Sequence, residues 1–272
     1  MGRRPVWKAE RQNRAAAGKM VCKCGGPQKN IILQTRAAWP GKDALVMQKF
    51  DAVLFDLDGT LIDSAPGIFD SFEFTLAQYE MTVPQERLRR FLGPPLRESF
   101  AKLLPPDEVE RAVEIYRAHY AEASGALTKL YPGTKELLSA LREAGYILCL
   151  ATSKVRYAAL KLLDKLELTP YFDYIGGSSP DASLDTKTAV IRHVLAQPCV
   201  QDKRAVMVGD RDNDMHGAAD CGLPAVGVLY GYGSRGELEP FAPLYLAPSA
   251  GALRAWLLQR KDQGEAALPE KE

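Results

Sequence analysis

From residue 50 onward, short apolar runs alternate with helical patterns, and this alternation constrains the fold more than any other feature of the sequence. The apolar runs are continuous, as expected for strands that are covered on both faces. The segments between them repeat apolar residues at the spacing of amphipathic helices. Strands and helices in alternation predict a parallel α/β sheet with right-handed crossovers.

The expected strands and helices can be placed by residue number. Because each helix leads from one strand to the next, the helices should cover the two faces of the sheet. The expected strands lie at 52–55, 146–151, 172–175, 205–208 and 225–229. The expected helices lie at 134–144, 155–166, 186–195, 212–221 and 250–259.

One long stretch interrupts the alternation. Between the first two expected strands the pattern is mostly helical, with Gly-Pro-Pro and Pro-Pro interruptions that separate helices at 66–79, 84–91, 96–104 and 107–122. This stretch predicts a helical cap placed over the carboxyl end of the first strand. The chain then divides into a disordered extension at 1–46, an α/β core at 47–64 and 131–262, a helical cap at 65–130 and a polar tail at 263–272.

The charge distribution argues against a nucleic-acid-binding body. Residues 1–46 hold ten of the 35 Lys and Arg residues but only Glu10 and Asp43 among the 34 acids, so the rest of the chain is acidic. Glycine and proline interrupt residues 1–46, which are expected to be disordered, and Met47 is a candidate translational start. A transit peptide is the alternative, but the stretch contains no serine.

The sequence shows no sign of a membrane partner or of an oxidising compartment. No apolar run approaches the ~18 residues that a membrane span needs. The five cysteines are scattered and odd in number, which favours reduced thiols and a cytoplasmic protein. We expect a monomer or a homodimer.

The first strand-like run ends in two carboxylates. Asp56 and Asp58 lie two residues apart, directly before Gly59. Two anions held in one small volume need a cation or a shared proton, and Mg²⁺ is a cation that carboxylates and phosphate oxygens bind well. The alternative is a surface turn, because Asp-Gly is a common turn signal.

Other strands also end in polar residues. Ligands of parallel sheets bind outside the carboxyl ends of the strands, so these residues should share one rim. A nucleophile, a metal site and donors for phosphoryl oxygens are what phosphoryl transfer needs. The residues expected on this rim, besides the first two carboxylates, are Thr152, Ser153, Lys154, Lys187, Asp210 and Asp214.

In these residues the chain resembles haloacid dehalogenase superfamily phosphatases whose helical cap is inserted after the first strand. The four motifs of that superfamily occur in order: Asp56-Leu-Asp58-Gly-Thr60, Thr152, Lys187, and Gly209-Asp210-x-x-x-Asp214. The resemblance implies a Rossmann-like, doubly wound parallel sheet with an inserted cap. It also implies metal-dependent phosphoryl transfer.

The resemblance assigns a catalytic role to four residues. Asp56 would attack phosphorus and form an aspartyl-phosphate. Asp58 would protonate the leaving oxygen and then deprotonate the attacking water. Thr152 would hydrogen-bond the phosphoryl group, and Lys187 would neutralise its charge.

The same resemblance assigns the metal site. Mg²⁺ would bind the Asp56 carboxylate, the backbone carbonyl of Asp58 and the Asp210 carboxylate. Asp214 would orient the waters on the metal. The expected cofactor is therefore Mg²⁺.

The expected reaction is hydrolysis of a small phosphorylated metabolite. The segments 92–96 and 152–154 resemble phosphoglycolate phosphatases and related 5′-nucleotidases. Thr152, Ser153, Lys154 and Arg97 are the expected substrate-binding residues. Dehalogenases lack the second Asp, which argues against that chemistry, whereas a phosphomutase and a non-catalytic binding protein stay open.

A glycine-rich segment after the last expected strand resembles a different kind of site. Gly231-Tyr232-Gly233-Ser-Arg-Gly236 matches the dinucleotide fingerprint, but Pro240 and Pro243 disrupt the helix that should follow it. We expect a glycine-rich loop beside the active rim instead.

Overall fold

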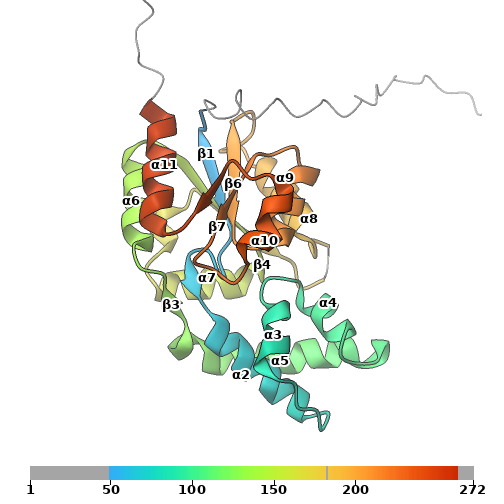
Figure 1. Cartoon of the computed structure of the whole chain (residues 1–272). Helices are drawn as coiled ribbons and strands as arrows, with labels where there is room; N and C mark the ends of the chain where they lie inside the picture. The colour runs from blue at the N-terminus through green and yellow to red at the C-terminus, as the bar shows by residue number, and fades with distance from the viewer. Residues whose placement is uncertain (1–48, 182, 263–272) are drawn as a thin grey trace, which may run out of the picture. The chain divides into compact units, whose positions relative to one another are not determined.

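A computed structural model describes residues 49–181 and 183–262 of the chain. The expectations for the extension at 1–46 and the tail at 263–272 lie outside the described residues. Figure 1 shows the strands of the core and the helices beside them, with α2 to α5 at the end of the sheet that the carboxyl ends of the strands approach.

Six parallel strands form one sheet in the order β5-β4-β1-β6-β7-β8. The expected parallel α/β fold is confirmed. The central strand β1 ends at Phe55, which pairs with Leu150 on β4 and with Val208 on β6. The strands are β1 Ala52–Phe55, β4 Ile147–Val155, β5 Tyr174–Ser178, β6 Ala205–Gly209, β7 Ala225–Val228 and β8 Tyr245–Ala247.

Helices cover both faces of this sheet (Figure 1). Side chains alternate between the faces along a strand, so Val53 and Phe55 pack with one helix layer and Ala52 and Leu54 with the other. One layer holds α6 Thr134–Glu143, α7 Arg156–Lys165 and α11 Ala250–Asp262. The other holds α8 Lys187–Leu195 and α9 Asp212–Asp220. The remaining short helices of this part are Thr169–Tyr171, α10 Arg235–Leu238 and Glu239–Phe241.

A helical segment that we call the insert, residues 64–128, lies between two short strands. These strands, β2 Ile62–Asp63 and β3 Lys129–Leu130, pair antiparallel and join the insert to the core. The insert has an aromatic core in which the Phe72 ring centroid lies 5.0 Å from those of Phe100 and Tyr116. Its helices are α2 Ala65–Ala77, α3 Gln85–Leu88, Arg89–Phe91, α4 Leu96–Ala101, Pro106–Glu108 and α5 Val109–Leu127.

The strand β5 begins and ends later than the sequence pattern predicts. The run 172–175 looks like the strand because it is apolar, whereas the actual strand includes Gly176 and Gly177. A Cβ on Gly176 would collide with Val194 of α8, so close helix packing explains why this strand carries no apolar side chain there. The strands β2, β3 and β8 are too short to give a periodic signal. Among the described residues, no helix has the length and apolar character that crossing a membrane requires.

Candidate active site

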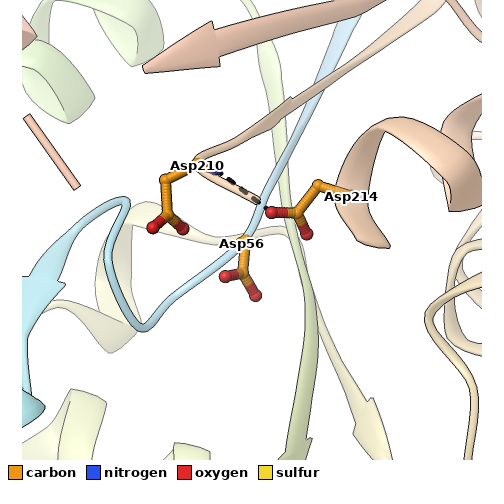
Figure 2. Close-up of side chains that lie close together, drawn as sticks. All are labelled: Asp56, Asp210 and Asp214. Carbon is orange, nitrogen blue, oxygen red and sulfur yellow. Dashed lines mark hydrogen bonds between the residues drawn. The ribbon is translucent and has the colours of Figure 1, made fainter. Parts of the chain in front are cut away.

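Three carboxylates meet at the carboxyl ends of the central strands. Asp56 follows β1, Asp210 follows β6, and Asp214 lies in the first turn of α9 (Figure 2). One carboxylate oxygen from each lies within 4.8 Å of the others, and all three residues are buried. The Asp210 amide donates to Asp214 Oδ2 at 3.1 Å, which fixes Asp214 against the strand end. The fold therefore brings Asp56 beside Asp210 and Asp214, which lie more than 150 positions later in the sequence.

Lys187 is the cation that faces these carboxylates. Its Nζ lies 2.6 Å from Asp56 Oδ1 and 2.8 Å from Asp214 Oδ1, and it donates to the Ala151 carbonyl at 3.1 Å. Lys187 opens α8, and the Thr186 hydroxyl caps that helix by accepting from the Ala189 amide. Burial disfavours its charge, but attraction to Asp214 and Asp56 outweighs burial and holds the pKa of Lys187 above its usual value.

The three carboxylates still carry more negative charge than Lys187 offsets. Burial raises the pKa of Asp56 to about 7, although Lys187 acts in the opposite direction. Burial, and then the neighbouring Asp214 and Asp56, raise the pKa of Asp210 well above its usual value. Both shifts indicate that the site favours a proton or a cation beside these groups. A set of carboxylate oxygens at this spacing fits a hard divalent ion such as Mg²⁺.

Asp58 lies on the side of the site that faces the insert. Ser64 Oγ donates to its Oδ1, and Lys154 Nζ lies 3.1 Å from its Oδ2. The Lys154 ammonium also donates to the Tyr120 hydroxyl of α5 at 3.1 Å. The partners of the Asp58 side chain are thus a serine and a lysine that do not contact the three-carboxylate group.

Thr152 and Ser153 lie at the rim end of β4, beside Asp56. The Thr152 hydroxyl is buried and accepts from the Lys154 amide at 3.2 Å. Among the described residues, Ser153 Oγ is buried and has no hydrogen-bond partner. Both residues, with Asp56, Asp58 and Lys154, line a cavity of about 480 Å³ whose other wall belongs to the insert.

Arg97 also lines this cavity, but its guanidinium is engaged. Its Nε and Nη2 donate to the Glu110 carboxylate at 2.6 and 3.1 Å. It further contacts Asp185 at 3.4 Å and the Pro180 carbonyl at 3.1 Å. The side chain therefore joins the insert to the loop before α8, and its charge is already offset by two carboxylates.

This geometry gives an expectation for Arg97→Gln. We expect KM for phosphoglycolate and for p-nitrophenyl phosphate to change by a similar, small factor of up to about fivefold, because a partly exposed ion pair contributes little free energy. Steady-state kinetics on both substrates would measure this. A rise in KM for phosphoglycolate alone would instead show that Arg97 binds the second anion of that substrate.

Sequence reasoning missed several polar residues of the site. Ser64, Tyr120 and Tyr232 all lie within one or two hydrogen bonds of Asp58. None belongs to the four catalytic motifs, although Tyr232 lies in the glycine-rich segment, and their contacts depend on how the insert and the loop after β7 pack. The expected glycine-rich loop beside the rim is present, since the Tyr232 amide donates to Asp210 Oδ2 at 2.7 Å.

The sequence of residues 53–228 matches the family model described as haloacid dehalogenase-like hydrolase. This match reaches from β1 to β7 and includes the insert and the motif residues at the rim, whereas β8 and Tyr232 lie beyond it. The chain belongs to the haloacid dehalogenase-like hydrolase family. The resemblance inferred from the four motifs is therefore confirmed.

The relatives that this chain resembles carry different names. The chain is 39% identical over 208 residues to tyrosine-protein kinase PtkA of Mycobacterium tuberculosis, covering 76% of this chain and 69% of that protein. It is 35% identical to a 5′-nucleotidase of Pseudomonas aeruginosa, covering 76% of this chain and 95% of that protein. Proteins named phosphoglycolate phosphatase match at 32–34% identity.

Solved structures agree with this assignment. A crystal structure described as a predicted phosphatase from Clostridium acetobutylicum superposes with a TM-score of 0.75 at 37% identity, covering 78% of this chain and all of that one. The family match and the phosphatase names among the relatives confirm the expectation of an enzyme of the phosphatase type.

Proposed function

We propose that this haloacid dehalogenase-like hydrolase is a Mg²⁺-dependent phosphomonoesterase that acts on a small phosphorylated metabolite through an aspartyl-phosphate at Asp56. The observation that carries the proposal is that two carboxylates only two residues apart in the sequence have different partners. Asp56 lies beside Lys187, Asp210 and Asp214, whereas Asp58 is held by Ser64 and Lys154. Carboxylates in different environments can take different roles in one reaction.

The first half of the reaction transfers the phosphoryl group to the protein. An Asp56 carboxylate oxygen attacks phosphorus, and the bond from phosphorus to the ester oxygen breaks. Asp58 supplies the proton that the departing alcohol oxygen needs. Lys187, Thr152 and Ser153 are the groups available to donate to the phosphoryl oxygens. Mg²⁺ would be held by Asp56, the Asp58 carbonyl and Asp210, with Asp214 beside them. The bound ion would reduce repulsion between nucleophile and phosphate and stabilise the developing charge.

The second half regenerates the enzyme. Asp58, now ionised, takes a proton from a water molecule that attacks phosphorus of the aspartyl-phosphate. The bond between phosphorus and the Asp56 oxygen breaks, and inorganic phosphate leaves.

In this proposal the chain divides into a core at 47–64 and 131–262 and a cap at 65–130 that covers the site.

Phosphoglycolate and nucleoside 5′-monophosphates are the two substrates that the named relatives suggest. Both are monoesters with a second polar part that the insert side of the cavity would contact. Lys154 and Arg97 are already paired with carboxylates, so neither is a free cation for a substrate carboxylate. A substrate panel of these two classes and of sugar phosphates would rank them by kcat/KM.

Removal of the metal gives the first test of this function. We expect the purified protein to release phosphate from p-nitrophenyl phosphate with Mg²⁺, and EDTA to lower the rate by at least about 10²-fold because the metal stabilises transition-state charge. Added Mg²⁺ should restore the rate. Phosphate release that EDTA leaves unchanged, or no release with Mg²⁺, would contradict the proposal.

A relative named as a tyrosine kinase suggests the opposite direction of transfer. The same assay with ATP labelled on its γ-phosphoryl group separates the two activities. Under this proposal, no tyrosine residue should retain the labelled phosphoryl group. Tyrosine-bound label that survives hydroxylamine, which cleaves acyl phosphates, would favour a kinase.

A further inference from the structure

The glycine-rich loop after β7 packs directly against the metal-site carboxylate Asp210. The Tyr232 amide donates to Asp210 Oδ2 at 2.7 Å. A Cβ on Gly231 would lie 2.5 Å from the Asp210 Cβ, and a Cβ on Gly233 would collide with the Asp210 carbonyl oxygen. Close approach to Asp210 therefore explains two of the three glycines in this segment, and no bound dinucleotide is needed to account for them.

The hydroxyl of Tyr232 reaches the point where the insert begins. It accepts from the Ser64 amide at 2.8 Å and from the Ala65 amide at 3.0 Å. Ser64 is the N-cap of α2, and its own side chain makes no capping bond. The first amides of a helix have no partner within the helix, and the Tyr232 hydroxyl accepts from two of them. The Ala65 amide also donates to Asp63 Oδ1 at 3.2 Å, so the Ser64 amide depends on Tyr232 more than the Ala65 amide does.

Ser64 connects this hydroxyl to Asp58. Its Oγ donates to Asp58 Oδ1 and lies 3.3 Å from the Tyr232 hydroxyl. Ser64 is fully buried and Asp58 is 8% exposed, so solvent offers little competition for these bonds. A continuous chain of contacts thus runs from the loop after β7, through the start of the insert, to one oxygen of Asp58.

We propose that Tyr232 is a positioning residue that fixes Ser64 at the junction of core and insert, and through Ser64 orients the Asp58 carboxyl group. The proposal rests on the proposed function, in which Asp58 protonates the leaving oxygen. Proton transfer needs the acid within hydrogen-bond reach of its target, and a small displacement costs a large part of the rate. The link from Tyr232 to Asp58 runs through the Ser64 hydroxyl.

The test uses two substrates that differ in their need for a proton. Phenyl phosphate and p-nitrophenyl phosphate share a ring, but p-nitrophenolate departs as a stable anion and phenolate does not. For Tyr232→Phe, which keeps the ring and the backbone amide, we expect kcat/KM on phenyl phosphate, which reports only the first half of the reaction, to fall about tenfold, the size of one or two lost buried hydrogen bonds. On p-nitrophenyl phosphate we expect a loss below about threefold.

Tyr245→Phe is the matched control, because Tyr245 lies in β8 and stacks on Trp256. It should behave as the wild type on both substrates. An equal loss for Tyr232→Phe on the two substrates, or no loss on phenyl phosphate, would overturn the proposal. Melting temperatures of both variants would show that the fold is retained.

Ser64→Ala tests the route and does not depend on how Tyr232→Phe folds. This variant should also lose more activity on phenyl phosphate than on p-nitrophenyl phosphate. The double variant should lose little more than the larger single loss, because residues in one chain of contacts are not additive. Full additivity would show that Tyr232 does not act through Ser64. A wild type that hydrolyses neither aryl phosphate would instead contradict the proposed function.

Discussion

Asp56→Asn is expected to lower kcat by at least about 10³-fold, the scale seen when a covalent catalyst is lost. The amide keeps the shape of the side chain but removes the nucleophilic anion and one metal-binding oxygen. It also keeps a group that can accept from Lys187, which lies 2.6 Å from Asp56 Oδ1. Steady-state and single-turnover rates on p-nitrophenyl phosphate with Mg²⁺ would measure the loss.

The fold should tolerate this change. Burial raises the pKa of Asp56 to about 7, so a neutral side chain there relieves repulsion with Asp214 and Asp210. We therefore expect the metal-free variant to melt at or above the temperature of the metal-free wild type. Asp51→Asn, at the opposite end of the same strand, is the control and should keep full activity. Retention of more than a tenth of the wild-type rate by Asp56→Asn would show that Asp56 is not the nucleophile.

Lys187→Met is expected to affect both activity and stability. The change leaves Asp56 and Asp214 buried without their cation, and breaking a buried ion pair by removing one partner costs about 3–5 kcal/mol. It also raises the pKa of Asp56 further, so less of the nucleophile is ionised at neutral pH. We expect kcat to fall by at least about 10²-fold.

Urea unfolding without metal and kinetics with Mg²⁺ would measure these two effects. Lys203→Met, at an exposed lysine before β6, is the matched control. For Lys187→Met, an unchanged free energy of unfolding together with a loss of less than about threefold in kcat would contradict the role of Lys187. A buried ion pair is expected to contribute far more to stability than that.

Much of the fold could be predicted because the alternation of strand and helix is a local property of the sequence. The Asp56 and Asp210 positions followed from the rule that parallel strands bring their carboxyl ends to one rim. Lys187 required the resemblance, since a lysine at a helix start has no distinctive local pattern. β5 was misplaced because its glycines reflect the packing of α8 and not an apolar run.

The contacts between core and insert could not be predicted from one sequence. Tyr232 and Ser64 are 168 residues apart, and their hydrogen bonds depend on the path of the loop after β7. The same reason applies to Arg97, whose partner Asp185 is 88 residues away. A sequence pattern shows that Arg97 is charged, but only the packed structure shows that its charge is already offset.

Asp56 is expected to carry the phosphoryl group during turnover, and chemical trapping tests this most directly. Borohydride reduces an aspartyl-phosphate to homoserine, which peptide mass spectrometry can locate. Wild-type protein quenched during turnover of p-nitrophenyl phosphate should contain homoserine in place of Asp56, and protein without substrate or with Asp56→Asn should not. Reduction at another residue, or none while phosphate is being released, would contradict a covalent mechanism at Asp56.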